Sequence, residues 1–269
     1  MWIDTHCHLD AHEFVAADGG PSGVGQRAGM HGVSMIVIPA VEVGNFAAVA
    51  QIAATTPNAC YALGIHPMCV PQATDADLEV LREQAQAAMA DPRFVAIGEI
   101  GLDFFIPALC EPDMRAKQER FFRAQLRIAR DLGLPVLTHV RRSQDQVLKH
   151  LRQITPPSGI AHAFNGSFQQ AQTFIDLGFH LGFGGAFTFT RALQIRRLAT
   201  TLPLTSIVME TDAPDISPAW NHPARNSPEN LPDIGLALAA LRGMEPLEVA
   251  NVTTRNAHAA LPRLTLMSI

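Results

Sequence analysis

Two histidines near the start of the chain, His6 and His8, have the spacing of a metal-binding pair. On an extended strand the side chains at positions i and i+2 point to the same side, so both imidazoles can bind one divalent ion. Cys7 points to the other side, and we interpret it as a packing residue. A lone His-x-His pair is more often two hydrogen-bonded histidines at a strand end. Further candidate ligands elsewhere in the chain are therefore needed to favour a metal site.

The same residue types recur where other short apolar runs end. Each of them alone is compatible with a buried side chain that is hydrogen-bonded or ion-paired. Together they supply four histidines and two carboxylates, enough for two divalent ions about 3.5–4 Å apart that share one carboxylate. The six candidate metal ligands are His6, His8, Glu99, His139, His162 and Asp212.

Three residues are candidates for direct roles in a reaction. Asp212 could bind an ion and also accept the proton of an attacking water, while Glu210 could support a ligand from behind. Glu99 is the candidate bridge between two ions. His66, in the sequence Gly-Ile-His-Pro, could contact a substrate or protonate a leaving group. A histidine that only stabilises a turn is an equally good interpretation of His66.

Arginines close to these positions could bind phosphate groups of a substrate. Arg141 follows His139 by two residues, and Arg225 lies in a later loop, so we expect both to bind substrate. For Arg142 and Arg191 we favour a solvated loop or helix start.

Several other chemistries lack their motifs. The sequence has no GxSxG nucleophile motif and no Walker GxxxxGK motif, and the glycines at 182–185 lack the dinucleotide-binding spacing. Lys117 and Lys149 both fall in predicted helices, which argues against a lysine-derived metal bridge or a Schiff base. This leaves Glu99 for the bridging role.

These residues must be positioned by alternating strands and helices. Short runs that are apolar on both faces, typical of buried parallel strands, occur at 2–5, 34–39, 60–64, 94–98, 135–138, 159–162, 180–184 and 206–210. Helical patterns occur at 46–54, 75–90, 112–132, 144–153, 169–177, 191–201, 229–242 and 246–259, with Thr74 and Gly133 as predicted caps. Residues 11–30 are poorly patterned. We predict a (β/α)8 TIM barrel, with a doubly wound open sheet as the alternative.

Composition limits the class of protein. The 269 residues form one predicted domain, 1–269, with 48% hydrophobic residues and a formal net charge of −5, unlike a disordered chain. Mild acidity argues against a broad basic surface for nucleic acid but permits a local positive pocket. The sequence contains neither the pattern of a signal peptide nor an apolar run long enough to span a membrane. With four cysteines and no CxxC pair, we expect reduced thiols and a cytoplasmic location. As a separate expectation, the protein is a monomer without an obligate protein partner.

Seven segments, distributed over almost the whole chain, contain the candidate residues: DTHCHLD at 4–10, GIHP at 64–67, GEIGLD at 98–103, HVR at 139–141, HAFNGS at 162–167, ETDAP at 210–214 and RNSPEN at 225–230. They resemble, in the same order, the motifs of the TatD family of metal-dependent deoxyribonucleases, which are amidohydrolase-like barrels. The combination of GExGLD and ETDxP is specific. Two residues, Ala163 and Asn165, and the segment 105–112 depart from the common pattern, and none of them is a proposed ligand.

The resemblance implies two divalent ions, one bound by His6, His8 and Asp212, the other by His139 and His162, with Glu99 bound to both. It implies hydrolysis of phosphodiester bonds in DNA. His and carboxylate ligands suit Zn, Mn, Ni or Fe, and carboxylate also tolerates Mg.

The leading hypothesis is therefore a DNase, or a hydrolase of another phosphate-bearing substrate. Because a basic stripe is lacking, we expect it to act on single strands or ends through few phosphate contacts. One alternative is hydrolysis of carboxylic esters or amides, as by a deacylase of mischarged aminoacyl-tRNA. The other is a metal-binding scaffold without catalysis.

Overall fold

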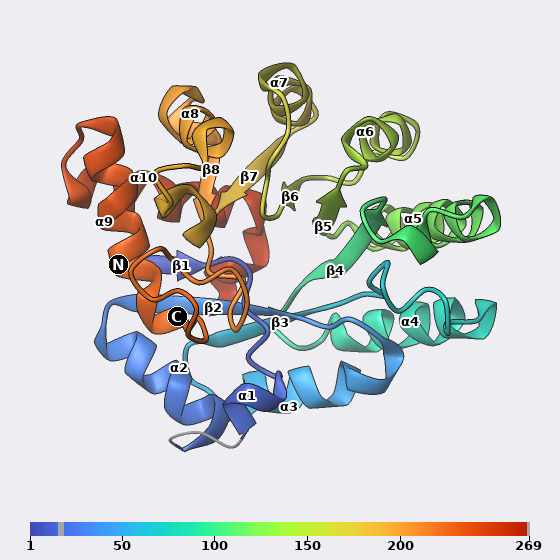
Figure 1. Ribbon diagram of the computed structural model, residues 1–269. Helices are drawn as coiled ribbons and strands as arrows, with labels where there is room; N and C mark the ends of the chain where they lie inside the picture. The colour runs from blue at the N-terminus through green and yellow to red at the C-terminus, as the bar shows by residue number, and fades with distance from the viewer. Residues whose placement is uncertain (16–18, 268–269) are drawn as a thin grey trace.

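Eight parallel strands lie side by side in the order in which they occur in the chain. In this computed structural model, which describes residues 1–15 and 19–267, the strands curl into a nearly closed barrel with helices around the outside (Figure 1). The predicted (β/α)8 barrel is confirmed, and the doubly wound sheet is excluded because its strand order would reverse. The strands are β1 (Trp2–Asp4), β2 (Val33–Pro39), β3 (Ala59–Leu63), β4 (Phe94–Asp103), β5 (Val136–Arg141), β6 (Gly159–Ala161), β7 (Phe179–Phe183) and β8 (Ile207–Met209).

The helices lie on the outer surface, where helices such as α5 and α10 pack against the strands (Figure 1). Asp77 accepts a hydrogen bond from the backbone N–H of Thr74 at 2.6 Å, which supports the predicted start of α4. Gly133 ends α5 in the left-handed conformation, as predicted, with φ of 67°. The helices are α1 (His12–Val15), α2 (Gly20–Met30), α3 (Phe46–Thr55), α4 (Asp75–Ala88), α5 (Pro112–Leu132), α6 (Gln144–Gln153), α7 (Phe168–Asp176), α8 (Leu193–Thr201), α9 (Leu231–Arg242) and α10 (Pro246–Ala260).

The inside of the barrel is a separate apolar cluster. Strand residues such as Ile3, Val95 and Ile160 pack there with side chains from the end of α10 and the turn after it, including Leu261 and Leu264. All of these side chains are buried. The last described part of the chain thus fills one end of the barrel, while the polar candidates lie at the carboxyl ends of the strands.

The first and last strands meet through the segments that carry candidate ligands. The backbone N–H of Asp212 donates to the carbonyl oxygen of His6 at 2.8 Å. Both carboxylate oxygens of Asp4 accept hydrogen bonds from Thr211, one from the backbone N–H at 2.9 Å and one from the hydroxyl at 2.6 Å. Closing the barrel therefore also brings His6 and Asp212 together.

The fourth strand differs from the prediction. The sequence predicts an end at 98, whereas β4 continues to Asp103 after its register against β5 shifts within 97–100. Gly101 looks like a strand breaker, but a Cβ at this position would overlap the carbonyl oxygen of His139. Glu99 therefore lies inside the strand, at the register shift, and not at its end.

The poorly patterned segment 11–30 forms α1 and α2, and its residues 16–18 lie outside the described part of the chain. One of its glycines has a packing reason, since a Cβ on Gly25 would overlap the methyl group of Thr56. In the described residues no helix is both long and apolar enough to cross a membrane.

Candidate metal centre

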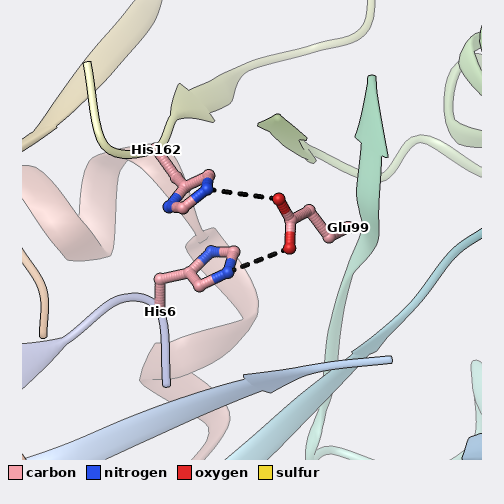
Figure 2. Close-up of side chains that lie close together, drawn as sticks. All are labelled: His6, Glu99 and His162. Carbon is pink, nitrogen blue, oxygen red and sulfur yellow. Dashed lines mark hydrogen bonds and ion pairs between the residues drawn. The ribbon is translucent and has the colours of Figure 1, made fainter. Parts of the chain in front are cut away.

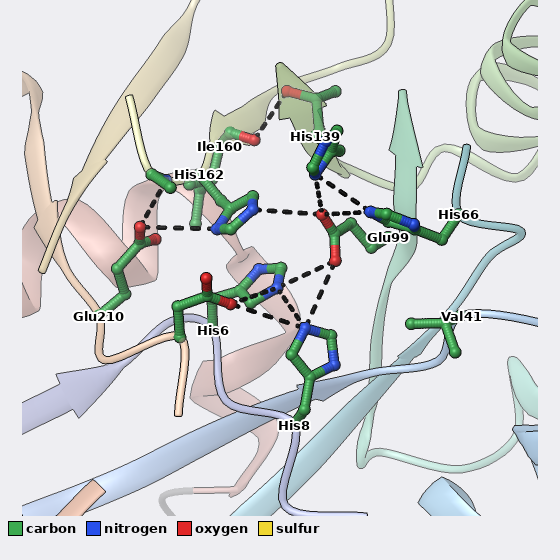
Figure 3. Close-up of polar contacts among 12 residues, drawn as sticks. His6, His8, Val41, His66, Glu99, His139, Ile160, His162 and Glu210 are labelled. Atoms are coloured by element: carbon green, nitrogen blue, oxygen red, sulfur yellow. Dashed lines mark hydrogen bonds and ion pairs between the residues drawn. The ribbon is translucent and has the colours of Figure 1, made fainter. Parts of the chain in front are cut away.

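Glu99 lies at the mouth of the barrel, and its two carboxylate oxygens face different groups of side chains (Figure 3). Oε2 lies 3.1 Å from Nε2 of His6 and 3.6 Å from Nε2 of His8. Oδ1 of Asp212 lies 3.7 and 3.6 Å from the same two nitrogens. We call His6, His8, Asp212 and the Oε2 oxygen of Glu99 the first ligand group.

The other oxygen of Glu99 faces three further imidazoles. Oε1 lies 2.9 Å from Nδ1 of His139, 3.2 Å from Nε2 of His162 and 3.3 Å from Nε2 of His66. We call His139, His162 and the Oε1 oxygen of Glu99 the second ligand group. Figure 2 shows how the carboxylate faces His6 with one oxygen and His162 with the other, and the rings of these two histidines stack with centroids 3.8 Å apart. The two groups are therefore direct neighbours.

Two carboxylates support the second ligand group from behind. Oδ2 of Asp103 accepts from Nε2 of His139 at 3.1 Å. Oε1 of Glu210 lies 3.6 Å from Nδ1 of His162 and accepts from the backbone N–H of Ala163 at 2.5 Å. A carboxylate behind an imidazole fixes the ring orientation and leaves the other nitrogen free to bind a metal.

Two buried glutamines of α5 hold the backbone next to this site. The Gln118 side chain accepts from the N–H of Asp103 at 2.9 Å. The Gln125 side chain accepts from the N–H of Ile65 at 2.7 Å and donates to its carbonyl oxygen at 3.1 Å. The long helix therefore fixes both Asp103 and the loop that carries His66.

His66 differs from the other imidazoles in its protonation. Its Nδ1 accepts a hydrogen bond from the backbone N–H of Met68 at 3.2 Å. In a neutral imidazole with an accepting Nδ1, the proton must be on Nε2. The Nε2 atom of His66 is thus a donor that faces Glu99, which fits a proton donor better than a metal ligand.

Burial and neighbouring charges set the ionisation of the site. Burial and the adjacent His162 lower the pKa of His6 to about 3, although Glu99 opposes them, so this imidazole is neutral at pH 7. Burial also lowers the pKa of His66, against the attraction of Glu99. For Glu99 itself, burial raises the pKa, but His66, His162 and His6 outweigh burial and hold the pKa well below its usual value. The bridging candidate is therefore ionised.

The second ligand group holds protons more tightly. Burial lowers the pKa of His162, but the charges of Glu99 and Asp212 outweigh burial and raise the pKa well above its usual value. The pKa of His139 is also raised, since its hydrogen bonds to Asp103 and Glu99 outweigh burial. A metal ion binds only deprotonated imidazole, so ions must compete with protons for this group.

The donor set fits divalent metal ions. Five imidazoles and two carboxylates direct nitrogen and oxygen atoms into one small space, and three groups of them could hold an ion: His6, Glu99 and His162; His6, His8 and Asp212; and His66, Glu99 and His139. Within the first ligand group Nε2 of His6 and Nε2 of His8 lie only 3.3 Å apart. Lone pairs gathered at such distances are what a cation requires.

The site opens into a hollow of about 1000 Å³ at the mouth of the barrel. Its walls include His8, His66, Glu99, His139, His162 and Asp212. Phe105 and Arg141 line another part, where the guanidinium of Arg141 lies 3.8 Å from the centroid of the Phe105 ring. The hollow is large enough for a substrate of small-ligand size.

Comparisons with known proteins agree on a family. The family described as TatD related DNase matches residues 3–262. The chain is 37% identical over 258 residues to the uncharacterized metal-dependent hydrolase YjjV of Escherichia coli (strain K12), covering 96% of each chain. An uncharacterized metal-dependent hydrolase of Haemophilus influenzae is also 37% identical, over 95% of this chain and 97% of that one. The chain belongs to the TatD family of metal-dependent hydrolases.

Solved structures agree with membership of the TatD family. The crystal structure of YjjV, a TatD homologue from Escherichia coli, is similar with a TM-score of 0.89 and 35% identity, covering 97% of this chain and 98% of that one. An organophosphorus hydrolase mutant is 16% identical with a TM-score of 0.67 and covers 97% of this chain and 92% of that one. This second likeness concerns the fold alone.

In this TatD-family hydrolase all the predicted metal ligands come together around Glu99, with His66 beside them. The two predicted substrate-binding arginines lie in different hollows. Arg141 lines the hollow at the metal centre, whereas Arg225 lines a second hollow beside it. Two arginines interpreted as solvated also reach these walls, because Arg142 lines the first hollow and Arg191 the second.

Sequence reasoning missed Asp103, which supports His139. It lies in the GEIGLD segment, but the strand was predicted to end at 98, so its side chain had no predicted direction. The signal that could have found Asp103 is the second carboxylate of that segment, four residues after Glu99. The sequence also does not indicate the role of Asp4, because Thr211, its hydrogen-bond partner, is 207 positions away.

Proposed function

We propose that this TatD-family hydrolase cleaves phosphodiester bonds in DNA, using two divalent ions that share Glu99. The observation that carries the proposal is the division of the Glu99 carboxylate, with Oε2 facing His6 and His8 and Oε1 facing His139 and His162. Such a carboxylate suits two ions about 3.5–4 Å apart. When bound, the ions would lower the pKa of water to about 7 and neutralise charge on phosphoryl oxygens.

Asp212 is the proposed general base. Burial raises the pKa of Asp212 to about 6, against the lowering effect of His162 and His8. A base with a pKa close to the working pH is ionised and still accepts a proton readily. Asp212 also lines the hollow, so the proton of a nucleophilic water can reach it.

His66 and Arg141 are proposed to act on the substrate. The proton on Nε2 of His66 is available to a phosphoryl oxygen or to a leaving group at the edge of the second ligand group. The guanidinium of Arg141 lies over Phe105 at the rim and suits a phosphate next to the scissile bond. The Arg141 cation, the proton donor His66 and membership of a family described as TatD related DNase favour a DNA substrate.

The test begins with the metal content of the purified protein, followed by hydrolysis of a labelled single-stranded oligonucleotide with and without Mg²⁺ or Mn²⁺. We expect about two ions per chain and metal-dependent cleavage. Two ions without DNA cleavage would overturn the phosphodiesterase proposal in favour of ester or amide hydrolysis, to be assayed on aminoacyl-tRNA and simple amides. Full occupancy without hydrolysis of any class would instead indicate a metal-binding scaffold.

A matched pair of variants shows whether cleavage comes from this site. Glu99→Gln removes the shared charge, whereas Glu83→Gln changes an exposed glutamate of α4. Cleavage must be lost in the first variant and kept in the second. Equal cleavage by both would mean that the activity arises elsewhere.

A further inference from the structure

A second hollow, of about 560 Å³, lies beside the one at the metal centre. The two share part of their walls, so a chain-like ligand can extend from one to the other. The volume of the second hollow falls within the range of about 300–1,000 Å³ that is usual for small-ligand sites. The shared wall is made of Ala186, Ala192, Pro214, Asp215 and Ile216.

The residues that line only the second hollow include an aromatic ring with polar neighbours. The Phe189 ring meets the His222 ring edge-on, with centroids 5.5 Å apart and an interplanar angle of 80°. The Arg191 guanidinium lies 5.9 Å from the Phe189 centroid. Phe189 is half-buried, so it is held by the fold and part of it remains accessible. An aromatic ring fixed in this way can stack with a nucleobase of any sequence.

A second cation is fixed on another part of the same wall. Nη1 of Arg225 donates to the carbonyl oxygen of Glu13 at 2.6 Å, and its guanidinium lies 4.6 Å from the Phe14 centroid. Both contacts hold the side chain without neutralising its charge. In residues 1–15 and 19–267, neither Arg225 nor Arg191 forms an ion pair with a carboxylate.

The balance of charge in this hollow favours an anion. Two arginines face it, and Asp215 is the one acidic residue among its lining residues. Asp215 lies on the shared wall, whereas both arginines lie on walls that belong to the second hollow alone. This positive region stands out in a chain whose formal net charge is −5. A phosphate is therefore expected at the arginines, away from Asp215, whose carboxylate can accept from the amino group of a base.

We propose that the second hollow binds the nucleotide next to the one cleaved, with its base on Phe189 and its phosphate at Arg191 and Arg225. This inference rests on the proposed function, because it places the neighbouring nucleotide of the same strand. It gives the enzyme a preference for a strand over an isolated phosphodiester. It also gives Arg225 a role in substrate binding outside the metal centre.

The experiment compares matched variants by binding. The variants Phe189→Ala and Arg191→Ala change the second hollow, while Phe168→Ala and Arg197→Ala remove an exposed phenylalanine and an exposed arginine that line neither hollow. The probe is a fluorescein-labelled single-stranded oligonucleotide with phosphorothioate linkages, which resist cleavage. Its Kd for the metal-loaded protein is measured by fluorescence anisotropy over a series of salt concentrations.

We expect Phe189→Ala and Arg191→Ala each to raise the Kd about tenfold, as for loss of one stacked base or one phosphate contact. Arg191→Ala should also reduce the slope of log K against log salt by about 0.7, whereas Phe189→Ala should leave that slope unchanged. Both control variants should bind as the parent protein does. A change in salt slope is a readout that mere loosening of the loop would not produce.

The outcomes separate this inference from the proposed function. If the parent protein cleaves DNA but Phe189→Ala and Arg191→Ala bind normally, the second hollow is not a nucleotide site and the inference is wrong. If the parent protein cleaves no DNA, the proposed function fails, and weaker binding by both variants would still support a nucleic-acid site here. If the parent protein does not bind the oligonucleotide, both proposals fail.

Discussion

The two ligand groups on either side of Glu99 are held in place by different means. The first group is fixed by the backbone, because the segments carrying His6 and Asp212 are hydrogen-bonded where the first and last strands meet. Nδ1 of His6 is buried and has no hydrogen-bond partner in the described structure. In the second group, Asp103 hydrogen-bonds to His139, and Glu210 lies at ion-pair distance, 3.6 Å, from Nδ1 of His162, which likewise has no hydrogen-bond partner in the described structure. Main-chain closure and supporting carboxylates thus position neighbouring ligands in one site.

The shared residue offers the strongest test of this comparison. Glu99→Ala removes the carboxylate that faces both groups, so we expect loss of both ions and a fall in turnover of more than about 100-fold. Metal analysis and steady-state kinetics with the oligonucleotide measure both effects. Near-normal metal content and turnover would contradict the shared site, and Glu83→Gln serves as the surface control.

Asp103→Asn should affect one group and spare the other. The amide keeps the size of the carboxylate but no longer provides the charge that supports His139, so metal affinity at the second group should fall about 10–100-fold. Titration with Mn²⁺ should then show one normal and one weakened site. Equal weakening of both sites would mean that the two groups do not act separately.

The pH dependence of turnover tests the base in the first group. Before metal binds, burial raises the pKa of Asp212 to about 6, and a bound cation lowers the pKa of a carboxylate ligand. Because Asp212 must be deprotonated to accept a proton, kcat/KM should fall below about pH 6 when metal is limiting, and the fall should move to lower pH as metal is added. The measurement is a pair of pH profiles from 4.5 to 8, at limiting and at saturating metal. Asp212→Asn should abolish this acidic limb, and a profile at limiting metal that is flat down to pH 5 would exclude Asp212 as the base.

Thr211→Val gives the smallest expected effect on turnover. It removes the hydroxyl that donates to Asp4 at 2.6 Å, leaving a buried acceptor with one fewer partner. We expect a loss of about 1–3 kcal/mol in the free energy of unfolding, with weaker metal binding at the first group only. Denaturant unfolding and Mn²⁺ titration measure the two consequences. Selective weakening of the second group would contradict the assignment of Thr211 to barrel closure.

The sequence was sufficient to predict the barrel and to find the residues around Glu99. Buried parallel strands have a strong apolar signal, and His or carboxylate side chains near their ends must meet at one mouth. It was insufficient for Asp103, because the register shift in β4 depends on contacts with β5. It was also insufficient to place Arg225, whose position depends on contacts with Glu13 and Phe14, more than 200 residues earlier in the chain.

The closing of the barrel's far end by Leu261 and Leu264 has a consequence for biosynthesis. While a ribosome makes the chain, all eight strands can emerge before these side chains exist. The interior around Val95 and Ile160 therefore stays open to water until residue 264 has left the exit tunnel. The metal centre is carried by the other end of the same strands. Its assembly is thus expected to be a late event in folding, which follows the emergence of residue 264.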